Sequence, residues 1–264
     1  MERIEGRSLS SRVIGYLNRL EKIEGGFSFA QTAPPCIRDT YYAILIFRLL
    51  GEKERPSEAT IRWVSKEPFH NEAPLSTLAC QVKLCSMLKI EVRARGIEER
   101  LRDELEKPPT PKRLFHLETL LKQMGAQPQR AALKEKAARL NPYPTPFDTL
   151  ETLFYKAVLS EERSRTWKRK VQEWLLACRN GDGGYGCRPN TTSFLEHIYW
   201  ATRLMKVANL QIGDKDKTLT LEFVLGSHSR RGGFGRAPEG VPFIESTYQA
   251  LWIIDFLGKL EDCR

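Results

Sequence analysis

The stretch NGDGGYGCRPNTTSFLEHIYWATRLMKVAN (180–209) opens with a glycine turn and an aromatic residue and continues into a segment with helical periodicity. The same design returns as SRRGGFGRAPEGVPFIESTYQALWIIDFLG (229–258), and it occurs earlier as IEGGFSFAQTAPPCIRDTYYAILIFRLLG (23–51). Glycine reaches positive φ at no steric cost, so a Gly-Gly pair after one helix predicts a reversal of chain direction. Three copies of turn, loop and apolar helix indicate a repeat protein.

A shorter pattern extends the repeat along the whole chain. An acidic or small polar residue followed by Thr opens five apolar segments, at Asp39-Thr40, Ser76-Thr77, Glu118-Thr119, Glu151-Thr152 and Ser246-Thr247, and His197-Ile198 fills the remaining slot. The matches recur every 33 to 49 residues. Apolar helices are therefore predicted at 40–51, 77–88, 119–125, 152–160, 198–207 and 247–258.

A second, more polar helix is predicted before each apolar one, at 8–23, 57–67, 97–107, 129–140, 164–179 and 217–226. Its apolar residues fall on a single stripe, for example Val13, Leu17 and Leu20, which is typical of a helix with one buried face. The proline-rich segments KPPTPKR (107–113) and NPYPTPF (141–147) are predicted as loops between units.

Six such hairpins predict an all-α fold, an (α/α)6 toroid whose inner helices form a barrel covered by the outer helices. An open solenoid follows from the same periodicity. Six repeats, with the glycine motif returning at both ends, favour the closed ring. Because no hairpin can bury its apolar face alone, we expect 1–264 to form a single domain.

Composition limits the class of protein. The chain has 264 residues, a hydrophobic content of 41% and a formal net charge of +9, and it carries no recognised nucleic-acid motif. No apolar run reaches about 18 residues, so we expect no membrane span. The N-terminus lacks the layout of a signal peptide, and the six cysteines are scattered without a CxxC pair. We therefore expect a cytoplasmic, reducing environment.

In the expected ring all inner helices run the same way, so their N-termini, with unpaired N–H groups and partial positive charge, share one rim. The segments that enter this rim carry Arg38, Arg113, Arg188 and Arg236, which suit phosphate oxygens. The inner helices offer Trp200, Tyr199, Tyr248 and Trp252 among other aromatic residues. This combination predicts an amphipathic ligand with a phosphate head. The alternative is that the aromatic residues simply fill the core.

These motifs resemble the prenyltransferase and squalene-cyclase repeat, and GGYGCRPNTTSFLEHIYW (183–200) is similar to the β-subunits of protein prenyltransferases. The resemblance implies a toroid that binds an isoprenoid diphosphate. On it, Arg188 takes the place of the arginine that binds the diphosphate, with Arg236 and Arg38 assisting. Trp200 takes the place of the aromatic residue that lines the isoprenoid tunnel. His197 replaces a tyrosine, and Thr191 replaces a lysine.

The same resemblance implies a zinc site, but the ligand positions have changed. Phe194 and Glu196 stand where the family has Asp and Cys, and Glu245 lies near the position of the His. Since phenylalanine cannot ligate a metal, we expect no tightly bound zinc. Mg²⁺ is expected only together with a diphosphate. Cys187 and His197 could form a different site with Glu196.

Glu196, Glu245 and His197 are the candidate catalytic residues. A buried carboxyl can act as an acid, but a glutamate here could equally be a helix cap or a first-turn charge. No Asp-x-Asp-Asp motif of the squalene-cyclase type occurs, and DKD (214–216) is predicted to lie in an exposed loop. Two functions remain open: a prenyltransferase-like or terpenoid-processing enzyme, and a non-catalytic scaffold for a lipid or a protein. The family also implies that a helical partner subunit could bind.

Overall fold

The computed structural model describes residues 8–52, 56–70, 72–92 and 97–260. Within these ranges the chain forms twelve helices and no strand, only isolated β-bridges in the turns. The helices are α1 (Leu9–Asn18), α2 (Ile37–Leu50), α3 (Glu58–Lys66), α4 (Leu75–Leu88), α5 (Ile97–Glu106), α6 (Pro111–Gln123), α7 (Gln127–Ala138), α8 (Leu150–Leu159), α9 (Arg165–Cys178), α10 (Leu195–Ala208), α11 (Asp214–Gly226) and α12 (Ile244–Phe256).

Several helices begin at capping residues that the sequence places there. Ser8, Ser57 and Ser164 accept a hydrogen bond from the third backbone N–H of the outer helices α1, α3 and α9. Thr110 and Thr149 do the same for the inner helices α6 and α8. Such side chains satisfy one of the four N–H groups that a helix leaves unpaired at its start.

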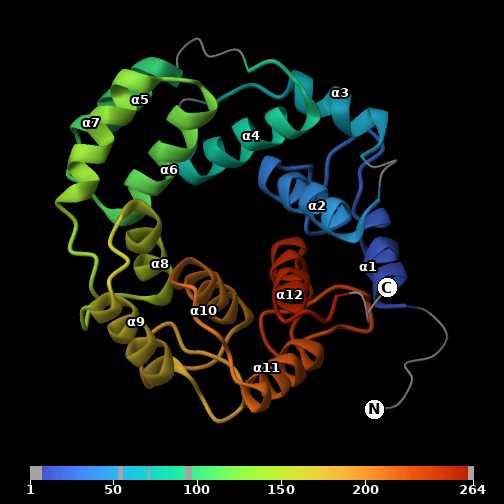
Figure 1. Cartoon of the computed structure of the whole chain (residues 1–264). Coiled ribbons are helices and arrows are strands. Elements are labelled where there is room, and N and C mark those ends of the chain that lie inside the picture. The colour runs from blue at the N-terminus through green and yellow to red at the C-terminus, as the bar shows by residue number, and fades with distance from the viewer. Residues whose placement is uncertain (1–7, 53–55, 71, 93–96, 261–264) are drawn as a thin grey trace.

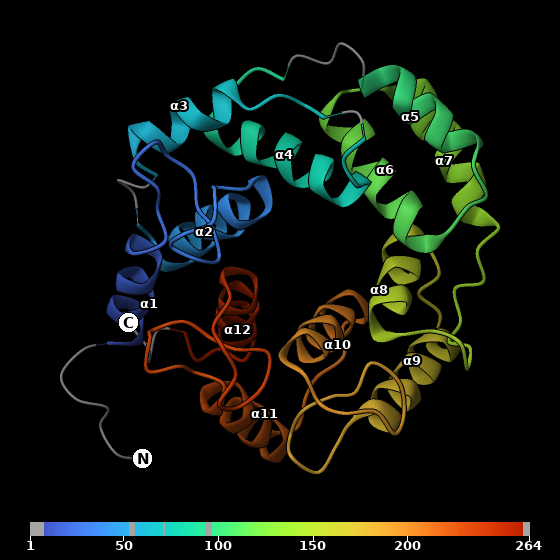
Figure 2. The same ribbon diagram turned by 180° about the vertical axis from the view of Figure 1, so that it is seen from behind.

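The helices alternate between two concentric rings. The even-numbered helices form the inner ring and the odd-numbered helices lie outside it, as both faces of the molecule show (Figures 1 and 2). Each inner helix contacts the next, and α12 packs against α2. The closed (α/α)6 toroid expected from the sequence is thus the fold of this chain, and the open solenoid is excluded.

The turns that contain Gly183 and Gly232 lie directly against the next outer helix. At Gly183 φ is 82°, and a Cβ atom there would lie 2.3 Å from the carbonyl oxygen of Leu219 in α11. At Gly232 φ is 95°, and a Cβ atom would lie 2.4 Å from the carbonyl oxygen of Arg12 in α1. Only glycine allows this approach. The second contact joins the last glycine turn to the first helix and so closes the outer ring.

The aromatic residues of the motif fill the space behind these turns. Phe27, Tyr185 and Phe234 are buried. The threonine of the motif recurs because it binds the turn. The Thr40 hydroxyl accepts a hydrogen bond from the Phe27 backbone N–H, and the Thr247 hydroxyl accepts one from the Phe234 backbone N–H.

Two expectations about element positions are wrong. Helix α6 begins at Pro111, eight residues before the predicted start, so the last three residues of KPPTPKR (107–113) are helical and Glu118-Thr119 lies in the middle of the helix. Proline fits the first helical position because the N–H that it lacks has no partner there. DKD (214–216) forms the first turn of the outer helix α11 rather than a loop.

In the described part of the chain, no helix is both long and apolar enough to cross a membrane.

Candidate functional site

The axis of the ring holds a cavity of about 760 Å³, lined by residues of all six inner helices. The lining follows the helical period, because residues two, five, six and nine of a helix share one face. The second residue of every inner helix lies at the cavity, in ring order Arg38, Ser76, Lys112, Glu151, Glu196 and Glu245. We call these six residues the rim layer.

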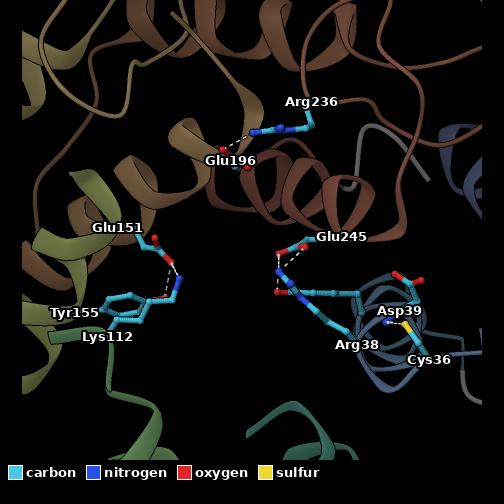
Figure 3. Close-up of polar contacts among 10 residues, drawn as sticks. Cys36, Arg38, Asp39, Lys112, Glu151, Tyr155, Glu196, Arg236 and Glu245 are labelled. Carbon is cyan, nitrogen blue, oxygen red and sulfur yellow. Dashed lines mark hydrogen bonds and ion pairs between the residues drawn. The ribbon is translucent and has the colours of Figure 1, made fainter. Parts of the chain in front are cut away.

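The first contact in the rim layer joins α12 to α2. Nη2 of Arg38 donates to both carboxylate oxygens of Glu245, at 3.0 and 2.9 Å (Figure 3). The Tyr42 hydroxyl donates to the same carboxylate at 2.9 Å. Burial, and then the charge of Glu245, raise the pKa of Tyr42 far above its usual value, so this phenol stays a proton donor.

A second contact of the same kind joins α6 to α8. Lys112 donates to Glu151 at 3.1 Å, and Tyr155 donates to the same oxygen at 2.8 Å (Figure 3). Burial and the neighbouring Glu151 charge raise the pKa of Tyr155. The arrangement repeats that of Glu245: one carboxylate held between a cation and a protonated phenol.

Glu196 also pairs with a cation, but its second partner is a histidine where Glu245 and Glu151 have a tyrosine. Arg236, in the loop before α12, donates to Glu196 at 2.6 Å, and Nε2 of His197 lies 3.4 Å from the same oxygen. A hydrogen bond from His197 lowers the pKa of Glu196; burial opposes this, and the Arg236 charge lowers the pKa further. Glu196 is therefore ionised near neutral pH, which suits a base or an electrostatic role and does not suit a general acid.

The rim is consequently less open to an anion than the sequence suggests. Arg38 and Arg236 are each paired with a glutamate. Two of the helix N-termini are also occupied, since Leu150 donates its backbone N–H to the carbonyl of Cys187, and Leu195 donates to that of Arg236. Glu151, Glu196 and Glu245 are all first-turn residues, where a negative charge is favoured by the helix dipole.

Below the rim lies an aromatic layer made of the fifth and sixth residues of the inner helices. Trp200 packs 5.3 Å from Phe154, 5.5 Å from Tyr155 and 5.1 Å from Tyr199, measured between ring centroids. The layer consists of Tyr41, Tyr42, Phe115, His116, Phe154, Tyr155, Tyr199, Trp200 and Tyr248, all at the cavity wall. These residues pack against each other and also line the cavity.

The ninth residues form a third layer, and the sequence interpretation missed its two cations. Lys83 of α4 and Arg203 of α10 lie at the cavity with Trp252 of α12. The Arg203 guanidinium carbon lies 4.3 Å from the ring centroid of Phe154, and its Nη1 donates to the Tyr199 hydroxyl at 3.0 Å. The helical spacing from the rim layer would have found both cations.

The expected site residues thus divide into two groups. Eight of them line the cavity: Arg38, Glu196, His197, Tyr199, Trp200, Glu245, Tyr248 and Trp252. Arg236 reaches the site through Glu196 but is not at the wall, and the exposed Arg188 is also outside the lining. The backbone N–H of Arg188 donates to the Thr191 hydroxyl, and its carbonyl accepts from that hydroxyl, so this residue shapes the loop.

The residues present do not fit a zinc ion. Phe194 precedes α10 and holds its ring 5.0 Å from the Arg236 guanidinium carbon and 5.5 Å from the His197 ring centroid. Across the described ranges, no three His, Cys, Asp or Glu residues gather closely enough to hold a metal. No such group forms from Cys187, Glu196 and His197, although all three residues line the cavity. The Cys187 sulfur instead contacts the Thr191 hydroxyl.

Comparison with known proteins agrees with this architecture. A family profile described as "Prenyltransferase alpha-alpha toroid domain" matches residues 3–75, 149–199 and 190–263. No protein of curated function matches by sequence. Two solved glycosidase structures, both single-residue variants and the second with glucose bound, cover 96% of this chain and 96% of their own. Their TM-scores are 0.58 and 0.57 at 11% identity, which shows the fold alone.

A third solved structure is that of Candida albicans protein geranylgeranyltransferase-I complexed with GGPP. It is 17% identical, with a TM-score of 0.40, and the alignment covers 97% of this chain and 79% of the other.

Proposed function

The chain belongs to the prenyltransferase alpha-alpha toroid family, and on that premise we propose that it binds an isoprenoid diphosphate in the central cavity. The prenyl chain lies against the aromatic layer, and the diphosphate pairs with cations of the wall. Zinc-thiolate chemistry has no part in this proposal, because Phe194 stands where the resemblance to protein prenyltransferases implies a zinc ligand. Any Mg²⁺ enters with the diphosphate rather than at a site of the protein.

The observation that carries the proposal is the aromatic layer itself. The cavity of about 760 Å³ falls within the range of ligand pockets, about 300–1,000 Å³. Its middle is walled by aromatic rings from five of the six inner helices. A long apolar chain gains from such a wall, and the aromatic faces also stabilise positive charge.

The site offers groups for an ionisation reaction. When the carbon–oxygen bond of a prenyl diphosphate breaks, the diphosphate leaves with the electron pair and the prenyl carbon becomes cationic. Tyr199, Trp200 and Trp252 would stabilise this cation through their ring faces. Glu196, ionised and next to His197, is the candidate that accepts the proton lost from the cation or from an acceptor. Glu245, paired with Arg38, would then have an electrostatic role.

Calorimetric titration with farnesyl and geranylgeranyl diphosphate tests binding. The wild-type protein should bind at least one of them, and Trp200→Ala should weaken the binding of each ligand that the wild type binds. The matched control is Phe147→Ala, which removes an aromatic residue whose side chain is 85% exposed, away from the cavity. Equal loss of both ligands in both variants would contradict the role of the aromatic layer.

The second candidate function is a non-catalytic toroid that binds a lipid or a protein, with or without a helical partner subunit. The pairing of every rim glutamate with a cation favours it, because a satisfied ion-pair network also suits a purely structural rim. If neither diphosphate binds at high micromolar concentration, the scaffold interpretation stands and the enzyme interpretation falls.

A further inference from the structure

We propose that Lys83 and Arg203 form an anion site in the third layer of the cavity, which takes a phosphate or diphosphate group. The site deepens the proposed function and, for its prenyl ligand, rests on it. It places the charged end of that ligand about two helical turns below the rim layer, instead of at Arg188.

The first step is position. Lys83 and Arg203 are both the ninth residues of their inner helices, and both line the same cavity. The other ninth residues at the wall are Leu45, Val158 and Trp252, none of which carries charge. Two cations therefore share one level of the channel with apolar and aromatic neighbours.

The second step is charge balance. In the rim layer, Arg38 pairs with Glu245 and Lys112 pairs with Glu151. Lys83 and Arg203 have no carboxylate partner among the residues that the structure describes. A half-buried charge without a counter-ion is costly, so this level of the cavity favours an anion that the chain itself does not supply.

The third step is preorganisation. The Arg203 guanidinium lies over the Phe154 ring, within 5.3 Å of the Tyr199 ring centroid and 5.6 Å of that of Trp200. Its one described acceptor is the Tyr199 hydroxyl, which leaves most of its five N–H donors for a ligand. A planar guanidinium held by ring contacts matches two phosphate oxygens at once.

The electrostatics of Lys83 agree with this geometry. Burial lowers the pKa of Lys83, the nearby Cys80 acts in the opposite direction, and the Arg203 charge lowers the pKa further. The two cations therefore repel each other. A phosphate bound by both cations would offset this repulsion with its negative charge, as expected for an anion site built from two cations.

Calorimetric titration with inorganic diphosphate, farnesyl diphosphate and uncharged farnesol tests the site. Lys83→Met and Arg203→Met should each lower the affinity for inorganic diphosphate and for farnesyl diphosphate about tenfold or more. The affinity for farnesol should not change. Lys134→Met removes an exposed charge from the outer helix α7 and is the control that should change nothing. Thermal melting of each variant checks folding. Lys83→Met should melt no lower than wild type, because it removes an unpaired charge.

The outcomes separate the two proposals. If inorganic diphosphate binds through Lys83 and Arg203 but farnesyl diphosphate does not bind, the anion site is confirmed and the proposal of a prenyl ligand is wrong. If farnesyl diphosphate binds wild type and both variants alike, while Arg188→Ala weakens it, the anion site is overturned and the prenyl ligand stands. Loss of farnesol together with farnesyl diphosphate in Lys83→Met would also overturn the anion site, since the uncharged ligand cannot sense a cation.

Discussion

Arg38 and Glu245 are 207 residues apart, yet Nη2 of the arginine lies 3.0 and 2.9 Å from the two oxygens of the glutamate. Each is the second residue of its helix, α2 and α12, and these are the two helices that close the ring. The ion pair thus depends on closure and reports on it.

A double-mutant cycle measures this pair. We expect Arg38→Ala and Glu245→Ala to show a coupling of about 0.5–1 kcal/mol in the free energy of unfolding, because the side chains are 52% and 33% exposed and solvent screens the charges. Urea denaturation gives the four values. The comparison pair is Arg169 and Glu173, which lie 3.7 Å apart within α9 and are more exposed; its coupling should be smaller. A coupling of zero at Arg38 and Glu245 would show that this pair does not stabilise the closed ring.

The glycine turns supply a sharper test of packing. Gly183→Ala should destabilise the protein by at least about 2 kcal/mol, because the residue has φ of 82° and a Cβ atom would meet the Leu219 carbonyl at 2.3 Å. Gly181 lies in the same turn with open space around it. Gly181→Ala should therefore change the unfolding free energy by less than about 0.5 kcal/mol. Similar values for the two variants in urea denaturation would show that the turn does not contact α11.

The sequence was informative about the fold because its two strongest signals, the helical period and the glycine turn, are local. They predict twelve helices in alternating classes, which the structure confirms. They also placed Glu196 and Glu245 at equivalent helix starts, a register that the structure confirms.

The rest of the site depended on register and on distant partners. The proline-rich segment before α6 resembles a loop, so the helix start at Pro111 was missed, and with it Lys112 and His116 in the cavity wall. The ion pairs of the rim join residues 39, 40 and 207 positions apart, which no local pattern reveals. For the same reason the sequence predicts phosphate contacts for Arg38 and Arg236 and does not reveal their glutamate partners.

The change at the zinc positions gives a prediction about metal content. Because Phe194 cannot ligate and Glu196 is engaged by Arg236, we expect the protein purified without chelator and dialysed to hold far less than one equivalent of zinc. Elemental analysis by plasma mass spectrometry measures this. One equivalent that survives dialysis, and that is lost in Glu196→Gln, would contradict the prediction and restore a thiolate-activating site.

Finally, His116 in the cavity wall predicts a pH dependence of stability. Burial, and then the charges of Lys112 and Lys83, lower its pKa from 6.5 to about 4, and its Nε2 atom is buried without a hydrogen-bond partner in the described structure. His116 binds a proton more readily in the unfolded chain than in the folded chain. Its contribution to the free energy of unfolding is therefore complete above pH 6.5 and decreases as the pH falls toward 4. Between pH 7.5 and 5 this amounts to about 2 kcal/mol. His116→Phe, which places an apolar ring beside Phe115 and Tyr155, should reduce the loss by that amount in urea denaturation at the two pH values. The control His70→Gln alters an exposed histidine and should keep the wild-type dependence; an equally steep loss in His116→Phe would show that His116 is not the group responsible.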